Sequence, residues 1–549
     1  MSVPFTIGRL IDYFTSPNPD LFLGLTPTMA AASLVGVFTL GACANFGRSL
    51  LMRLSGLRII ARLRKDTYAS ALRQEVNFIE NSEGDVLSRL SVDTNIVGES
   101  VTGNLSDGLR AVVTGTVGVG LMFYLSPTLT ALMLAIVPPI SLGAVLYGRY
   151  LKRLSKRTQE ALGKMSDTAQ ESISALRTVQ ASNAEKHALK LFAKDVDSVL
   201  GLQRKEAFAT ATFYGSTGLA GNVTILALLG YGGTLVSRGV ISVGDLSSLL
   251  LYSAYVGGSM GQLSSFFTTL MKGVGAGTRI FDLLEREPVI APSKGTVLEG
   301  RAVGTIKFEG VRFAYPKRRD VQVLDGFDLE IKPGESVALV GKSGSGKSSV
   351  QALLLRFYDP DLGQIKFNGT DIRDYTPASW RSQIGLVPQD PVLFSGTIAE
   401  NIAYDRPDAS QAEIEEAARL ANCEFVWDFP EKFETKINKN SLSGGQRQRV
   451  AIARALLKHA SILCLDEASA ALDGASEHKV NDAIAKILQS RTVSCLIVAH
   501  RLSTIQRAEK VAVLDEGRIV EIGTYKELAS REGSKFREVM GAQIAAVEY

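Results

Sequence analysis

The sequence predicts an α-helical membrane domain followed by an α/β domain of the P-loop NTPase class. Three observations predict this: long runs without charge in the first half, a glycine-rich motif after an apolar run in the second, and short strands alternating with amphipathic helices from Thr305 onward. At 549 residues the chain is too long for one core. Its net charge of only +4 argues against a nucleic-acid partner bound through charge.

Charge-free runs define the membrane domain. They cover 21–47, 111–148, 207–237 and 246–271. About 20 apolar residues cross a bilayer, so the second run holds two spans, separated at Ser126-Pro127-Thr128. We predict five complete spans, near 25–50, 107–126, 129–149, 213–236 and 242–271. Residues 1–9 are expected to be the outer end of a further span whose beginning is absent.

Two long connections, 48–110 and 149–206, are rich in Arg and Lys, whereas the opposite connections are short. The positive-inside rule places both on the inner side, and their similar length predicts helical hairpins that extend beyond the lipid. No ionisable side chain lies in the middle of a predicted span, which argues against a proton relay or a pore built on buried charge. The four cysteines have no metal-ligand spacing and are expected to be buried thiols.

A phosphate-binding loop is predicted directly after the strand-like run Ser336–Val340. It consists of Gly341, Lys342, Ser343, Gly344, Ser345, Gly346, Lys347, Ser348 and Ser349. Glycines let backbone N–H groups turn toward phosphate oxygens, and the following helix adds its positive end. Lys347 is predicted to contact the β- and γ-phosphates of ATP, and the Ser348 hydroxyl to bind Mg²⁺. A Gly/Ser-rich surface turn is the alternative, which the strand before and the apolar helix after disfavour.

Two further strands are predicted to end in polar side chains. Asp466 and Glu467 follow the apolar run 461–465, where Asp466 is expected to hold Mg²⁺ through water and Glu467 to polarise the attacking water. His500 follows the apolar run 493–499 and is expected to donate a hydrogen bond near the γ-phosphate.

A second anion site is predicted where a helix opens after Ser-Gly-Gly. The segment is Leu442, Ser443, Gly444, Gly445 and Gln446. Each chain has one such segment and one phosphate loop. Two chains placed head to tail could therefore enclose each ATP between them, with C₂ symmetry.

With these residues in view, the second half resembles the nucleotide-binding domain of ATP-binding cassette (ABC) transporters along its whole length. The matching motifs are Walker A at Gly341–Ser349, the signature at Leu442–Gln446, Walker B at Ile462–Asp466 with the catalytic base Glu467, and the switch histidine His500. The resemblance adds Gln389 as the Q-loop residue that contacts Mg²⁺, Tyr315 as the aromatic that stacks on adenine, and Asp473 in the D-loop.

The first half is similar to the six-span half of type IV exporters, and segments 78–90 and 173–180 match the family's two coupling helices. Segments 104–110, 205–209 and 270–277 look most like those of the mitochondrial B-family half-transporters, the group with the erythroid mitochondrial transporter and the yeast mitochondrial peptide exporter. That resemblance implies the mitochondrial inner membrane, nucleotide domains in the matrix and export from the matrix. The chain departs from the family pattern in two places. Its first span is mostly missing, and Lys436–Ser441 lacks the usual Gly-Glu-x-Gly before the signature.

The chain is therefore predicted to be an ATP-hydrolysing half-transporter that forms a dimer, and the sequence does not identify its solute. The predicted domains are 1–285 and 305–549, joined by a linker at 286–304. Its expected cofactors are ATP and Mg²⁺, and its partners a second half-transporter, most simply a second copy, the lipid bilayer and an unknown solute. Two alternatives stay open: a truncated inactive form, and a regulatory membrane ATPase that moves no solute. A soluble cassette ATPase is disfavoured by the long uncharged runs.

Overall fold

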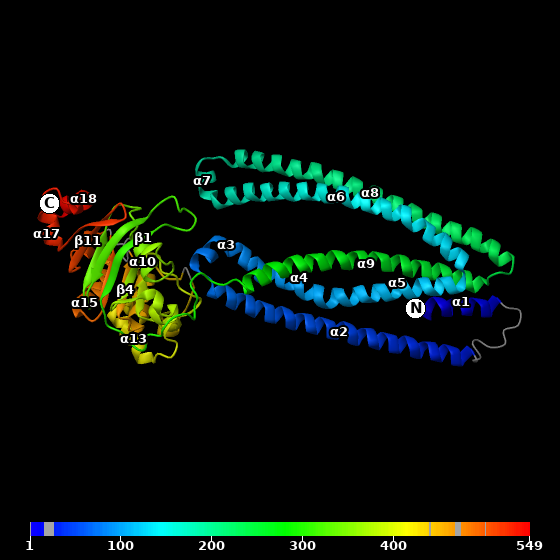
Figure 1. Ribbon diagram of the computed structural model, residues 1–549, viewed down its shortest axis with the longest axis horizontal. Coiled ribbons are helices and arrows are strands. Elements are labelled where there is room, and N and C mark those ends of the chain that lie inside the picture. Colours follow the sequence, from blue (N-terminus) through cyan, green and yellow to red (C-terminus); the bar gives the residue numbers. More distant parts are fainter. Residues whose placement is uncertain (1, 16–26, 439–440, 467–473, 500, 549) are drawn as a thin grey trace. The chain divides into compact units, whose positions relative to one another are not determined.

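The computed structural model describes residues 2–15, 27–438, 441–466, 474–499 and 501–548. It contains two compact units, shown in Figure 1. One is a helical unit of Met1–Asp66 and Ser88–Asp282, and the other is a mixed unit of Thr67–Leu87 and Leu283–Tyr549. The sequence did not indicate that Thr67–Leu87 packs with the second unit.

The described part of the helical unit consists of helices, of which α2, α6, α8 and α9 are the long ones. In chain order these are α1 (Ser2–Thr15), α2 (Pro27–Arg73), the π-helical η1 (Arg89–Asp93), α4 (Thr94–Glu99), the π-helical η2 (Ser100–Asn104), α5 (Leu105–Leu125), α6 (Pro127–Ser174), α7 (Leu176–Ala181), α8 (Glu185–Ser237) and α9 (Val243–Leu284). Among the described residues, three helical segments are long and apolar enough to cross a membrane: Ala32–Arg73, Val76–Leu125 and Glu185–Ser237. The predicted span near 129–149 lies inside α6, and the one near 242–271 lies inside α9 except for its first residue. They remain predictions as spans.

The predicted break between two spans is confirmed at Ser126. Its backbone is extended, with φ −157° and ψ 104°, and its hydroxyl accepts a hydrogen bond from the N–H of Leu129 at 3.4 Å. Pro127 then occupies the first turn of α6, where a missing N–H costs nothing. A serine cap followed by proline therefore ends α5 and starts α6 within one residue.

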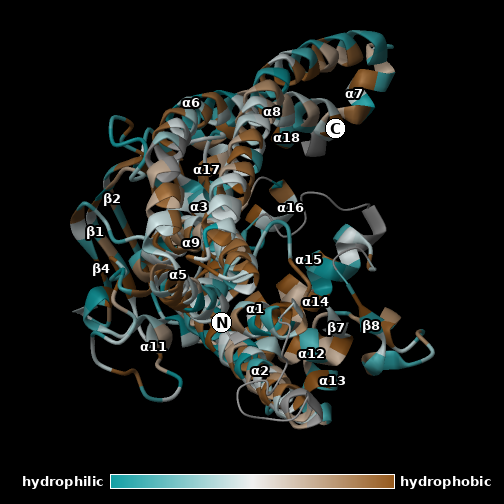
Figure 2. Ribbon diagram, turned by 90° about the vertical axis from the view of Figure 1, so that its right-hand side faces the viewer, coloured by the Kyte–Doolittle hydropathy of each residue, from teal (hydrophilic) through white to brown (hydrophobic). Residues whose placement is uncertain are grey.

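Both predicted helical hairpins are also present. The helix α2 continues to Arg73 and is followed by α3 (Val76–Ser88), while α6 and α8 are joined through α7. Figure 2 shows hydrophobic colour along α5 and α9, and frequent hydrophilic colour in α6 and α8 near α7. The inner parts of α6 and α8 are tied by Asp195, which accepts from Thr168 at 2.9 Å and pairs with Lys164 at 3.3 Å.

Close helix contacts in the helical unit depend on glycine. A Cβ at Gly244 of α9 would lie 2.0 Å from the carbonyl oxygen of Gly8 in α1, so only glycine allows this approach. Asp12 then accepts hydrogen bonds from Ser242 Oγ and Gly244 N, both at 2.8 Å, and so caps the start of α9.

A buried ion pair lies further along α9. Arg279 Nε donates at 2.9 Å to the carboxylate of Asp93, whose side chain is 2% exposed.

The described residues of the mixed unit form three sheets. Its strands are β1 (Ile306–Phe313), β2 (Leu324–Ile331), β3 (Ser336–Val340), β4 (Leu362–Phe367), β5 (Thr370–Asp371), β6 (Ile384–Val387), β7 (Gly396–Thr397), β8 (Lys436–Ile437), β9 (Ile462–Asp466), β10 (Ser494–Val498), β11 (Lys510–Asp515) and β12 (Arg518–Gly523). The central sheet has the order β12-β11-β3-β10-β9-β6, and all its pairings are parallel except β11 with β12. The antiparallel sheet has the order β2-β1-β4-β5, and β7 pairs with β8.

Two apolar cores cover the two faces of the central sheet. One lies between that sheet, the antiparallel sheet and α10 (Lys347–Leu354), around Phe308, Phe327 and Trp380. Helix α11 (Pro377–Ser382) belongs to this same core through Trp380. The other core lies under α12 (Ile398–Ile402), α13 (Gln411–Leu420), α14 (Gly444–Leu457), α15 (Gly474–Ser490), α16 (Leu502–Ile505), α17 (Tyr525–Ser530) and α18 (Lys535–Glu548). Residues on successive positions of the strands are buried because helices or strands cover both sheet faces.

The cysteine prediction is correct for three residues of four. Cys423, Cys464 and Cys495 are buried free thiols of the mixed unit, but Cys43 is exposed on α2. The reason is that Cys43 lies in a span, where an apolar side chain can face outward instead of into a protein core.

Candidate functional site

Neighbouring parallel strands of the central sheet end in the segments that the sequence singles out. The order β3-β10-β9-β6 places the ends of these strands along one edge. Gly341 follows β3, Asp466 is the last residue of β9, and Gln389 lies two residues after β6. Ligands of open α/β sheets bind at the carboxyl ends of the strands, so the topology supports one site here.

The phosphate loop has the backbone that its glycines predict. Gly344 and Gly346 have φ of +81° and +104°, a left-handed conformation that favours glycine. A Cβ at Gly341 would lie 2.4 Å from the carbonyl oxygen of Leu514, so this position also needs glycine. The chain then enters α10 at Lys347, and the first N–H groups of α10 have no partner within the helix. Together these features form a concave anion site.

The Lys347 ammonium is buried inside this loop. The residue is 6% exposed, and Nζ donates to the carbonyl oxygens of Gly341 and Lys342 at 2.8 and 2.9 Å. The Ser345 hydroxyl is also buried and has no hydrogen-bond partner among the described residues. A bound phosphate could therefore meet a cation and a hydroxyl that are already in place.

An open cavity of about 710 Å³ lies over the loop. Its lining residues are Tyr315, Arg318, Val321, Val323, Ser343, Gly344, Gly346, Lys347, Ser348, Ser349 and Gln389. The structure thus brings the predicted Tyr315 and Gln389 to the phosphate loop, although both are distant from it in sequence. Arg318 was not predicted, since a basic residue in the turn after β1 also fits a solvated loop.

Aromatic side chains hold Tyr315 at the wall of this cavity. Its ring packs edge-on against Phe313 and Tyr358, at centroid distances of 5.0 and 5.4 Å. Its hydroxyl lies 2.9 Å from Oγ of Ser349, the last residue of the phosphate loop. The ring is therefore fixed at two points, as a platform for a planar base requires.

The three predicted Mg²⁺ ligands supply the oxygen donors that this ion prefers: a hydroxyl, an amide and a carboxylate. Ser348 and Gln389 line the same cavity, and Asp466 is half-buried at the end of β9. Asp466 is not among the residues that line the cavity. The chemistry of the donor set fits Mg²⁺.

The segment Leu442–Gln446 forms a capped helix start. Ser443 is exposed, and its Oγ accepts from the N–H of Gln446 at 3.3 Å while Gln446 Oε1 accepts from the N–H of Ser443 at 2.9 Å. This capping box leaves the start of α14 ordered and open to solvent. None of the five residues lines the cavity over the phosphate loop. The predicted Glu467, Asp473 and His500 lie outside the described residues.

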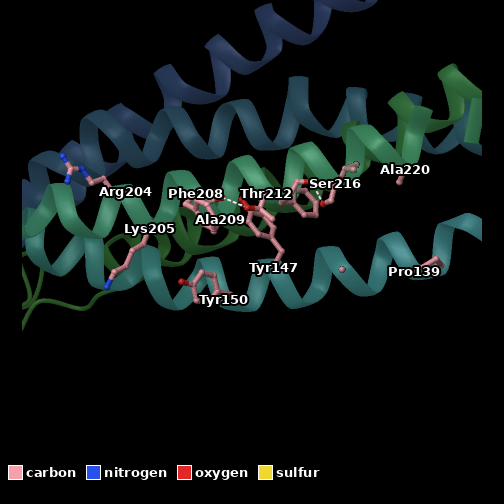
Figure 3. A pocket seen from close by; sticks show the side chains of 13 residues that line it. Pro139, Tyr147, Tyr150, Arg204, Lys205, Phe208, Ala209, Thr212, Ser216 and Ala220 are labelled. Atoms are coloured by element: carbon pink, nitrogen blue, oxygen red, sulfur yellow. Dashed lines mark hydrogen bonds between the residues drawn. The ribbon is translucent and has the colours of Figure 1, made fainter. Parts of the chain in front are cut away.

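A groove of about 890 Å³ lies between α6 and α8 in the helical unit (Figure 3). Its lining residues are Pro139, Gly143, Tyr147, Tyr150, Arg204, Lys205, Phe208, Ala209, Thr212, Phe213, Ser216, Thr217 and Ala220. Arg204 and Lys205 lie at one end of the groove, and Pro139 and Ala220 lie at the other. The sequence did not predict this groove, because the groove depends on which faces of α6 and α8 lie against each other.

Comparison with known proteins decides the family. Residues 1–260 match the family described as ABC transporter transmembrane region, and residues 324–470 match the family described as ABC transporter. The mouse protein "ATP-binding cassette sub-family B member 10, mitochondrial" is 48% identical over 551 residues, which are 99% of this chain and 77% of the relative. The chain belongs to the ABC transporters.

Two other curated relatives and one solved structure agree. This ABC transporter is 44% identical to the fission yeast (Schizosaccharomyces pombe) "ATP-dependent permease MDL1, mitochondrial", over 100% of the chain and 76% of the relative. It is 46% identical to the "ABC multidrug transporter mdr2" of Aspergillus fumigatus, over 100% of the chain and 70% of the relative. The structure of a bacterial Atm1-family ABC exporter with ATP bound matches with a TM-score of 0.80 at 27% identity, over 99% of this chain and 95% of that one.

These matches confirm the predicted fold, a type IV exporter membrane domain followed by an ABC nucleotide-binding domain, and the predicted ATPase class. As an ABC transporter the protein binds ATP and couples its hydrolysis to transport across a membrane. The predicted resemblance to the mitochondrial half-transporters is confirmed as well.

Proposed function

We propose that two copies of this chain form an exporter that moves a solute out of the mitochondrial matrix. The phosphate loop carries the proposal, because its buried Lys347 and the fixed ring of Tyr315 fit one nucleotide. The location is supported by relatives whose names are mitochondrial and by the Arg- and Lys-rich hairpins on the predicted inner side. For the functional parts we propose 1–285 as membrane domain, 286–304 as linker and 305–549 as nucleotide-binding domain.

Each proposed role follows from a side chain's chemistry. Lys347 neutralises phosphate charge, and backbone N–H groups of the loop orient the phosphates. Tyr315 stacks on the base. Glu467 accepts a proton from the attacking water, and His500 donates a hydrogen bond to the transferred phosphate.

Mg²⁺ is the proposed metal, with Ser348, Gln389 and Asp466 as the residues that hold it directly or through water. When bound, it supplies charge stabilisation at the phosphate oxygens. Among the described residues no group of three His, Cys, Asp or Glu side chains could hold a metal. The proposed site has one carboxylate together with a hydroxyl and an amide oxygen. It needs no cluster of acidic side chains, because Mg²⁺ bound with nucleotide takes few protein carboxylates.

The dimer follows from the two anion sites of one chain. Since Ser443 does not line the cavity over its own phosphate loop, we propose that it and Asp473 complete the partner's ATP site. We further propose that α3 and α7, which overlap segments 78–90 and 173–180, act as coupling helices between ATP binding and the spans.

Crosslinking tests the dimer. Ser343→Cys and Ser443→Cys are placed in separate protomers with Glu467→Gln to stop hydrolysis, and Cys43→Ser removes the one exposed native thiol. We expect disulfide formation that depends on ATP. A Lys294→Cys variant in the linker replaces Ser343→Cys as the control. Absence of crosslinks at saturating ATP, with ATP binding intact, would overturn the shared site.

Vesicle transport tests the export. Reconstituted protein with outward nucleotide domains should accumulate a solute only with hydrolysable ATP, and the Glu467→Gln variant should not. ATP hydrolysis without movement of any solute in a metabolite extract would favour the regulatory ATPase instead.

A further inference from the structure

The groove between α6 and α8 is formed by one stripe of each helix. Along α6 the lining residues recur every three or four positions, at Pro139, Gly143, Tyr147 and Tyr150. Along α8 the same spacing joins Arg204 to Phe208, Thr212, Ser216 and Ala220. Residues at this spacing share one helix face, so the groove runs parallel to both helices over several turns.

Aromatic rings form the middle of the groove. Tyr147 of α6 stacks on Phe213 of α8 with centroids 4.2 Å apart and planes 4° apart, and its hydroxyl lies 3.1 Å from Thr210 Oγ1. This pair joins the helices across the groove. Phe208 and Tyr150 are 76% and 53% exposed and present further ring surface, while small residues leave the space between them open.

Two charged residues line the groove, Arg204 and Lys205, and both are cations. Arg204 and Lys205 are exposed, and neither has an ion pair among the described residues. The neighbouring Glu206 is not a lining residue, and its carboxylate accepts a hydrogen bond from Thr158 of α6 at 3.4 Å. The groove therefore carries positive charge at one end.

The rest of the α8 side of the groove lies in a charge-free part of the chain, and on the α6 side Arg149 is the one charged residue between Pro139 and Tyr150 but does not line the groove. No Asp, Glu, Lys or Arg occurs from Ala207 to Ser237. A ligand in the groove would thus meet cations at its inner end and ring or aliphatic surface elsewhere. We propose that this groove binds an amphipathic organic anion, with an aromatic body against Tyr147, Phe208 and Phe213 and its acid group at Arg204 and Lys205.

The volume and the polar groups favour a transported solute as the occupant. About 890 Å³ is within the usual range of small-molecule sites. Thr212 and Ser216 donate to backbone carbonyls of their own helix at 2.9 Å, so their hydroxyl oxygens can still accept hydrogen bonds. A lipid acyl chain would use none of these acceptors. The assignment rests on the proposed transport function and names the chemical class of its solute.

Photolabelling of the full-length protein in phosphatidylcholine nanodiscs tests the site. The anionic probe is 4-benzoylbenzoate, and the matched neutral probe is 4-benzoylbenzamide. Mass spectrometry locates the labelled residues. The test variant is Arg204→Gln/Lys205→Gln. The control is Arg149→Gln/Lys152→Gln, which removes the same charge from exposed positions of α6 outside the lining.

We expect the anionic probe to label groove residues of α6 and α8. Loss of both cations should reduce that labelling about fivefold or more, since charge-assisted contacts are the strong ones. Labelling by the neutral probe, and anionic labelling of the control variant, should change less than about twofold. Phe208→Ala should weaken labelling by both probes.

Three outcomes would overturn the assignment. Unchanged anionic labelling in the test variant removes Arg204 and Lys205 as the recognition groups. Loss of labelling when phosphatidylglycerol replaces part of the lipid assigns the groove to a lipid headgroup. No groove labelling in the wild-type protein means that another protomer covers it. ATP hydrolysis, measured in the same nanodiscs, reports separately on the transporter itself: intact hydrolysis with any of these outcomes removes only the groove.

Discussion

Lys342 Nζ in the phosphate loop lies 2.9 Å from Glu538 Oε1 in the C-terminal helix α18. Lys535 also binds this carboxylate, at 2.8 Å, and these two lysines, Lys535 first, hold the pKa of Glu538 down at about 2. The carbonyl of Lys342 accepts from Lys347. The C-terminal helix therefore contacts the residue whose carbonyl oxygen accepts a hydrogen bond from Lys347.

Breaking this ion pair should change ATP binding modestly. We expect Glu538→Gln to raise the KM for ATP about two- to threefold at low salt. A change of this size corresponds to the free energy of an exposed ion pair in a small network. The charge reversal Lys342→Glu should act similarly, and Lys342→Glu/Glu538→Lys should return toward the wild-type value. Steady-state ATPase assays measure all three. A double variant no better than the singles would contradict the pairing.

The pH dependence of this contact has a defined sign. Because the folded pKa of Glu538 is lowered from 4.5 to about 2, its contribution to stability is fully present above pH 4.5. It is lost as the pH falls from 4.5 toward 2. The effect of Glu538→Gln on thermal unfolding should thus be constant between pH 6 and 8 and disappear in acid. An effect that grows in acid would contradict the assignment.

Lys347→Ala should lose nucleotide binding. The variant removes the cation at the centre of the phosphate loop, and we expect at least about tenfold weaker binding of an ATP analogue. Lys294→Ala, at an exposed linker position, serves as the control. Equal affinity in both variants would remove Lys347 from its proposed role. Isothermal titration is a suitable measurement.

Arg286 fixes the Thr67–Leu87 segment to the mixed unit. Its guanidinium pairs with Glu75 and lies 4.0 Å from the Phe78 ring centroid, and the Gln74 amide donates to its carbonyl at 3.1 Å. Ser70 Oγ donates to the carbonyl of Leu283 at 2.8 Å beside them. Glu75 is 10% exposed in its side chain, and its Oε2 has no partner among the described residues.

Removing Arg286 would leave a buried carboxylate. We expect Arg286→Ala to lower the free energy of unfolding by roughly 2–3 kcal/mol. Because Glu75→Gln removes the uncompensated charge, the double variant Glu75→Gln/Arg286→Ala should recover part of this loss. Chemical denaturation in detergent measures it. Equal stability of the single and double variants would show that the charge is not the cause.

The native cysteines should differ in reactivity. Burial raises the pKa of the Cys423 and Cys495 thiols to about 12 and that of Cys464 as well, so all three are neutral at pH 7 to 9. A membrane-permeable maleimide should modify Cys43 first and the other three only after unfolding. Mass spectrometry of the labelled chain counts the sites. Labelling of Cys464 in native protein would contradict the buried sheet.

Local patterns predicted much of this fold. The break at Ser126-Pro127, the strands before the phosphate loop and before Asp466, and the helix start at Ser443 all depend on a few consecutive residues. The family resemblance added Tyr315 and Gln389, which have no local signal of their own.

Contacts between distant segments were not predicted. Glu538 reaches Lys342 across 196 residues, and Arg286 reaches Glu75 across 211. The groove between α6 and α8 was missed for the same reason. Helical spacing shows which residues share one face of a helix, but not which other helix lies against that face. The π-helical segments η1 and η2 were not predicted from the sequence either.

The short corner at Ser126 and Pro127 has a consequence for biosynthesis. With no intervening loop to thread, the two flanking segments can enter the bilayer together as a hairpin, and a polar tag inserted between them would have to be carried across with that pair. Lengthening this corner should therefore affect assembly of the protein in the membrane well before it affects the chemistry of ATP.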